Sequence, residues 1–102
     1  MSTQKEKDPQ NVDTLIEVEW DVIRDLRKML KDPHLSRAEK IRASNAVAYH
    51  ASVLNKLLAQ KGEDSKFNDA TLGDFIKGVE PRTARRVTRE FKRWTRRLTL
   101  KK

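Results

Sequence analysis

The chain has 102 residues, with 23 basic and 15 acidic side chains, a net charge of +8 and no cysteine. This length provides for one domain with a modest core, and the lack of cysteine excludes a disulfide scaffold and a thiolate metal site. No apolar run approaches the roughly 18 residues of a membrane span, and the polar first ten residues lack the apolar region of a signal peptide. We therefore expect an intracellular, cytoplasmic protein.

The first helix is predicted after a polar lead-in. Residues 1–10 are charged and polar, and we expect them to be disordered. Beyond them, apolar residues recur at spacings of three and four, which predicts a helix from Asn11 or Asp13 onwards. Pro33 ends it near Lys31, because proline lacks a backbone donor and disfavours helical geometry in the preceding residue.

The second helix is predicted from Ser36 to about Lys61. Ser36 and Glu39 match a capping box, and Gly62 suits the left-handed position that ends a helix. Apolar residues cover most of its circumference, which predicts packing against more than one neighbour. Its remaining narrow face is polar and holds Arg42, Asn45, Ser52, Lys56 and Gln60.

A short third helix is predicted after Asn68 or Asp69 and before Gly78, and a fourth begins at Pro81, since proline is favoured at the first helical position. We expect one all-α domain over residues 11–100, a small bundle of three main helices and one short helix, with a basic C-terminal helix. The second helix is predicted to be the central rod. The first packs antiparallel to it, and the fourth covers its remaining side.

Residues 80–102 carry the entire net charge, with ten basic and two acidic side chains, while residues 1–79 are neutral. On a helical wheel the segment has an apolar stripe, expected to anchor it to the second helix. The stripe consists of Ala84, Val87, Phe91, Trp94 and Leu98.

The opposite arc of this fourth helix, about 140° wide, is cationic. Because little within the segment neutralises these cations, they repel one another until a polyanion binds. Arginine outnumbers lysine seven to three, and guanidinium groups suit bidentate contact with phosphate. We predict a nucleic-acid-binding face, with DNA favoured over RNA, formed by Arg82, Arg85, Arg86, Arg89, Lys92, Arg93, Arg96 and Arg97.

Other functions are open for the same helix. A solvated face, an acidic protein surface and a membrane surface are alternatives, although the apolar stripe is needed in the core and so disfavours the membrane. The runner-up hypothesis is an accessory subunit of a polymerase, packaging or ribonucleoprotein complex. In that case the basic helix contacts nucleic acid or an acidic partner.

A helix-turn-helix regulator is a third hypothesis. Residues 70–87 resemble that motif in outline, with a short helix, a glycine turn and a longer helix. Asp74 and Lys77 depart from it, because apolar residues are expected at both positions. The resemblance implies that the major groove is faced by Arg82, Thr83, Arg85 and Arg86.

Three polar or aromatic features of the first helix need an interpretation. Glu19 lies within its apolar arc and needs one, for which His50, Tyr49 or an arginine of the fourth helix is a candidate. Trp20 lies off the stripe, which indicates a second packing contact or a partner surface. A row of carboxylates is interpreted as a solvated flank rather than a cation site, and consists of Asp13, Glu17, Asp21 and Asp25.

Catalysis is not expected. The sequence shows no nucleophile paired with a base, no set of metal ligands and no phosphate-binding glycine loop. His34 and His50 are the two histidines, and they are far apart in the chain. We expect a non-enzymatic protein without a metal or a cofactor.

Overall fold

A computed structural model describes residues 11–100, and within them it contains four α-helices and no strand. α2 (Val12–Leu30) is capped by Asn11, whose Oδ1 accepts the backbone N–H groups of Asp13 and Thr14 at 2.8 and 3.3 Å. The helix ends before Pro33, as predicted. The expected disordered lead-in lies outside the described residues.

α3 (Arg37–Gln60) begins with the predicted capping box. The Glu39 N–H donates to the Ser36 hydroxyl and the Ser36 N–H donates to the Glu39 carboxylate, both at 3.1 Å. The bond from the Ser36 backbone N–H is the main cause of a lowered pKa at Glu39. Gly62 follows the helix with a φ of +78°, in the left-handed region that favours glycine.

α4 (Asp69–Phe75) is capped by Asn68, whose side chain accepts the backbone N–H of Thr71 at 2.9 Å. The turn that follows contains Gly78, with a φ of +95°. α5 (Pro81–Leu100) then begins at the expected proline. The predicted set of three long helices and one short helix is therefore confirmed.

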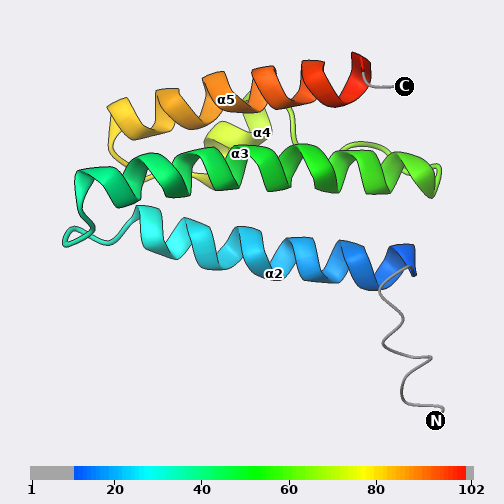
Figure 1. The fold of residues 1–102 in the computed structure, drawn as a ribbon, viewed down its shortest axis with the longest axis horizontal. Coiled ribbons are helices and arrows are strands. Elements are labelled where there is room, and N and C mark those ends of the chain that lie inside the picture. Colours follow the sequence, from blue (N-terminus) through cyan, green and yellow to red (C-terminus); the bar gives the residue numbers. More distant parts are fainter. Residues whose placement is uncertain (1–10, 101–102) are drawn as a thin grey trace, which may run out of the picture.

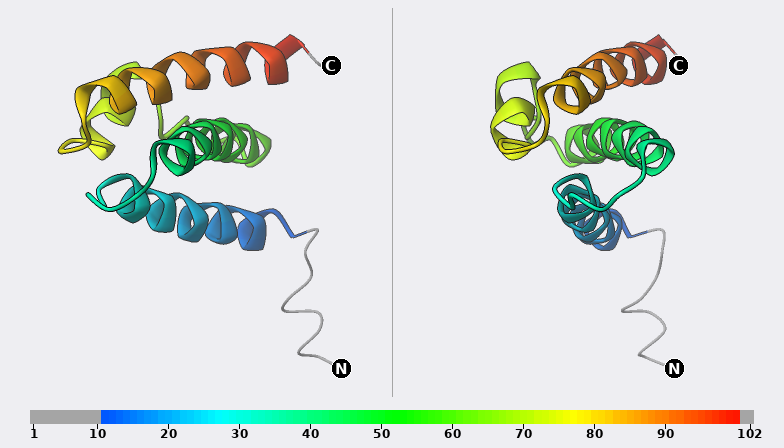
Figure 2. Two further views of the ribbon diagram at one scale, coloured as in Figure 1. Left: turned by 60° about the vertical axis from the view of Figure 1, so that its left-hand side comes forward. Right: turned by 90° about the vertical axis from the view of Figure 1, so that its left-hand side faces the viewer.

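The three long helices are stacked with α3 in the middle, as the sequence predicted (Figure 1). α2 lies on one side and runs antiparallel to α3, while α5 lies on the other side and runs parallel to it (Figures 1 and 2). The chain between α3 and α5 must therefore return along the length of α3, and α4 belongs to this return. As a result, α3 and α5 begin at the same end of the molecule.

The core lies on both sides of α3, which explains why that helix is apolar around most of its circumference. Ile23 of α2, Leu54 of α3 and Val87 of α5 are each fully buried. Trp20 makes a second packing contact, because its ring centre lies 5.5 Å from that of Phe67. The other buried apolar residues are Leu30, Ala43, Val47, Ala48, Ala51, Leu58, Phe67, Leu72, Ile76, Val79 and Phe91.

Candidate nucleic-acid interface

The apolar stripe of α5 anchors this helix to the rest of the domain. Val87 and Phe91 are buried, and Ala84 and Trp94 are partly buried against the same core. Leu98, in the last turns, is half-buried. The predicted anchoring role of the stripe is thereby confirmed, and it holds the opposite face of α5 in a fixed direction.

Polar side chains also join α3 and α5. Ser52 was expected on the polar face of α3, but this prediction is wrong, because the residue is only 4% exposed. Its hydroxyl donates to the carbonyl of Ala48 at 3.1 Å and lies 3.2 Å from the hydroxyl of Thr95 on α5. A small hydroxyl residue fits this close contact between helices because a neighbouring carbonyl satisfies its donor.

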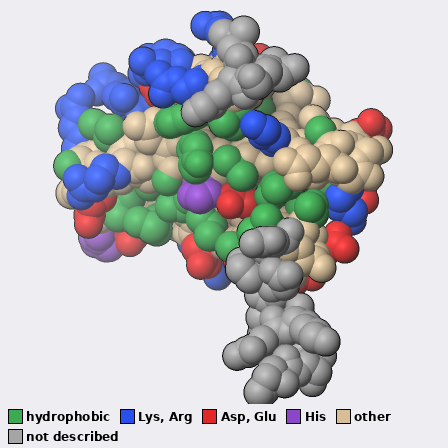
Figure 3. Space-filling model, turned by 45° about the vertical axis from the view of Figure 1, so that its right-hand side comes forward, with side chains coloured by type: hydrophobic (Ala, Val, Ile, Leu, Met, Phe, Trp, Pro, Cys, Tyr) green, Lys and Arg blue, Asp and Glu red, His purple; other side chains and the backbone are tan. Residues whose placement is uncertain are grey.

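The eight predicted cations lie along the outer part of α5. Seven are exposed, and Arg86 is half-buried at the edge that faces α3. The guanidinium carbon of Arg97 lies 5.1 Å from the ring centre of Trp94, a cation–π contact that connects the row to the core. Figure 3 shows Lys and Arg side chains gathered over α5, whereas Asp and Glu are more frequent toward α2.

The expectation that little neutralises the row needs correction. Lys92 Nζ lies 3.3 Å from a carboxylate oxygen of Asp69 on α4, a pair between positions distant in sequence. Glu90 of α5 is only 9% exposed, and its carboxylate is 3.3 Å from Arg93 and 4.0 Å from Arg89. Within residues 11–100, no carboxylate lies within 4.0 Å of the five other cations, Arg82, Arg85, Arg86, Arg96 and Arg97.

Two further cations join the α5 face from a part of the chain that the prediction did not include. Arg37 and Lys40 belong to the first turn of α3, and they line a pocket together with Arg82 and Arg86 of α5. The charges of Arg37 and Lys40 and their spacing within one helix can be recognised from the sequence. The parallel direction of α3 and α5, which brings the two pairs together, depends on the path of the long return segment and has no local signal.

The structure bears on the helix-turn-helix interpretation at Thr83. This residue was expected to face a DNA groove, but it is 7% exposed and its hydroxyl donates to the carboxylate of Glu80 at 3.1 Å. It is therefore turned away from any ligand of the outer face. Asp74 and Lys77, which depart from the motif, are exposed.

Glu19 has the partner that its position required. Its carboxylate lies 2.6 Å from Nδ1 of His50, joining α2 to α3. In the acidic row of α2, Asp21 pairs with Arg24 at 2.8 Å and Asp13 pairs with Lys61 at 2.6 Å. The hydrogen bond with Asp13 is the main cause of a raised pKa at Lys61.

The acidic row of α2 is an exposed flank with ion pairs, as the sequence indicated. Over residues 11–100, no cluster of three or more His, Asp or Glu side chains is arranged to hold a metal ion. No helix in that range combines the length and apolarity needed to cross a bilayer.

Comparisons with protein families, with curated proteins and with solved structures found no match.

Proposed function

We propose that this protein binds nucleic acid without catalysing a reaction, through contacts between the α5 cations and backbone phosphates. One observation carries the proposal: five arginines of a firmly packed helix have no carboxylate partner among the described residues, while residues 1–79 have no net charge. A dense row of cations on a neutral body concentrates polyanions at one face.

DNA is the favoured ligand for a geometric reason. A 20-residue helix such as α5 is about 30 Å long, which is enough to follow several phosphates. The major groove of B-form DNA admits an α-helix, whereas the major groove of an RNA duplex is too deep and narrow for side chains to read. Since Thr83 faces inward and most row residues are long cations, contacts to phosphate rather than to bases dominate the proposal.

A salt titration tests the proposal. Labelled duplex DNA, single-stranded DNA and duplex RNA are titrated with the protein at several salt concentrations, and binding is followed by fluorescence anisotropy. If the five unpaired arginines and Arg89 each neutralise one phosphate, log affinity for duplex DNA falls against log salt with a slope of about −5.

Two outcomes contradict this proposal. The first is no binding to any of the three nucleic acids at low salt. The second is displacement of DNA by an equal charge concentration of polyglutamate, which identifies an acidic protein surface as the partner of α5.

Trp94 provides a local readout, because it lies in α5 beside Arg97 while Trp20 packs against Phe67. In the variant Trp20→Phe the remaining tryptophan is Trp94, and we expect DNA to change its fluorescence. In the matched variant Trp94→Phe we expect no change on adding DNA. A response of Trp20 alone contradicts the placement of the ligand on α5.

A further inference from the structure

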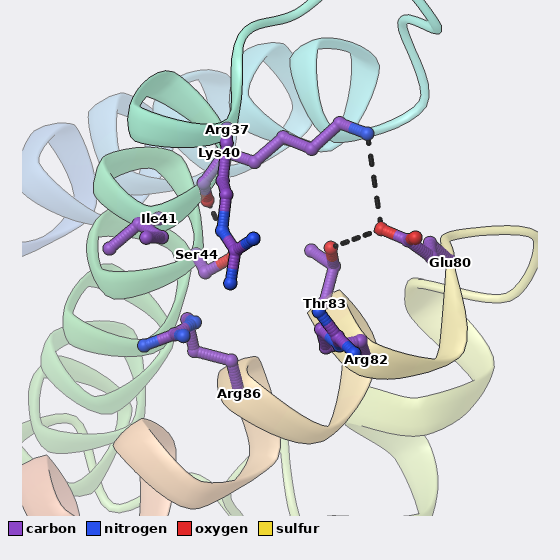
Figure 4. A pocket seen from close by; sticks show the side chains of 8 residues that line it. All are labelled: Arg37, Lys40, Ile41, Ser44, Glu80, Arg82, Thr83 and Arg86. Carbon is purple, nitrogen blue, oxygen red and sulfur yellow. Dashed lines mark hydrogen bonds and ion pairs between the residues drawn. The ribbon is translucent and has the colours of Figure 1, made fainter.

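A pocket of about 210 Å³ lies where α3 and α5 begin (Figure 4). One water molecule needs roughly 10–15 Å³ of such space, so the pocket has room for a tetrahedral phosphate group. The two helices line it with side chains whose positions differ by about forty in the sequence. They are Arg37, Lys40, Ile41 and Ser44 from α3, and Glu80, Arg82, Thr83 and Arg86 from α5 and the residue before it.

The lining is strongly cationic, with four basic side chains against the single carboxylate of Glu80. That carboxylate accepts the Thr83 hydroxyl at 3.1 Å and lies 3.9 Å from Lys40 Nζ, so it is already engaged. In the part of the chain that the structure describes, no carboxylate lies within 4.0 Å of the other three cations, Arg37, Arg82 and Arg86.

Arginine side chains from both helices reach the pocket. Figure 4 shows Arg37 extending from α3 and Arg86 extending from α5 into the space between the helices. The Ser44 hydroxyl donates to the carbonyl of Lys40 at 2.7 Å, so it is satisfied inside the protein and the cations are the donors that remain. Cations that line one pocket repel one another, and a bound anion lowers that repulsion.

We propose that this pocket binds one phosphate group, and that its ligand is the terminal phosphomonoester of a nucleic acid whose backbone lies along α5. The second part of this proposal rests on the proposed function. A phosphomonoester carries a charge of about −1.5 to −2 at pH 7 and three acceptor oxygens, whereas each internal phosphate of a nucleic acid carries a single charge. Four cations around a concave site match the higher charge, and guanidinium groups match the oxygens by bidentate contact.

Inorganic phosphate tests the pocket by itself. Phosphate is added to the ¹⁵N-labelled full-length protein at constant ionic strength, and amide shifts are followed by NMR. We expect saturable shifts in the first turns of α3 and α5, with affinity at least about tenfold weaker in the double variant Arg37→Gln and Arg86→Gln. The matched control is Arg42→Gln with Lys56→Gln, which removes two exposed cations of α3 that line neither the pocket nor the α5 row. Shifts that do not saturate, or an equal loss of phosphate affinity in the control variant, overturn the proposal that this pocket binds phosphate.

Oligonucleotides with and without a 5′-phosphate then test the source of the phosphate. We expect about tenfold tighter binding of the phosphorylated strand, lost in the double pocket variant. If the two strands bind equally while phosphate still saturates the pocket, the pocket does not bind the terminal phosphate of a nucleic acid. Free phosphate is then identified as its ligand. If neither strand binds while phosphate does, the proposed function fails and the phosphate pocket stands.

Discussion

Replacing Phe91 with alanine is expected to destabilise the folded domain by about 3–5 kcal/mol. The Phe91 side chain is 5% exposed and packs in the core between α5 and α3. Truncation removes the apolar burial of an aromatic ring and leaves a cavity in the apolar contact that anchors the cationic helix. Since small domains are stable by only about 5–15 kcal/mol, the change removes much of the stability. Urea unfolding followed by circular dichroism measures it.

The matched control is Val18→Ala on α2, because the Val18 side chain is 49% exposed. An exposed substitution of this kind is expected to change stability by no more than about 0.5 kcal/mol. If Phe91→Ala were as mild as the control, α5 would be a loosely attached helix. The conclusion that the cationic face is rigid, on which both proposals depend, would then be wrong.

The helices were predictable because their ends are specified by local chemistry. Ser36 and Glu39 form the capping box of α3, and Asn68 caps α4. Gly62 adopts a left-handed conformation after α3, and Pro81 occupies the first position of α5. Each of these signals acts within a few residues, so it can be recognised without knowing the fold.

Contacts between distant segments were less predictable. The His50 partner of Glu19 was among three candidates, because a polar residue inside an apolar arc requires a partner but does not specify which one. The pairing of Lys92 with Asp69 was not predicted, since it depends on where the return segment places α4. The burial of Ser52 depends similarly on which face of α3 receives α5.

The cationic row was recognised from the sequence, but its extent was not. Arg37 and Lys40 line the pocket at the start of α5 because α3 and α5 run in parallel. An antiparallel arrangement would have placed the end of α3 beside Arg82 instead. Sequence spacing determines which residues share one helix face, whereas the relative direction of two helices determines which faces combine into a site.

The variant Arg85→Gln, Arg89→Gln and Arg96→Gln is expected to weaken duplex DNA binding by about 500-fold at 0.1 M salt. Each lost phosphate contact removes about 0.9 from the salt slope, which should change from about −5 to about −3. These three side chains are exposed. Removing them also relieves repulsion between cations four positions apart, worth about 0.2–0.5 kcal/mol per pair, so folding stability should stay constant or rise slightly.

A matched triple variant separates the position of the charge from its amount. Arg24→Gln and Lys28→Gln on α2, with Lys61→Gln at the end of α3, remove the same charge. α2 lies on the opposite side of α3 from α5 (Figure 1), and Lys61 is on the α2 side because it pairs with Asp13 of α2 at 2.6 Å. We expect this variant to keep the salt slope near −5 and to lose little affinity, because the proposed interface places the phosphates along α5. If both triple variants lose affinity equally, binding reflects net charge alone, and α5 is not a specific interface. Weaker binding with unchanged folding in the α5 variant only is the result that the proposed interface requires.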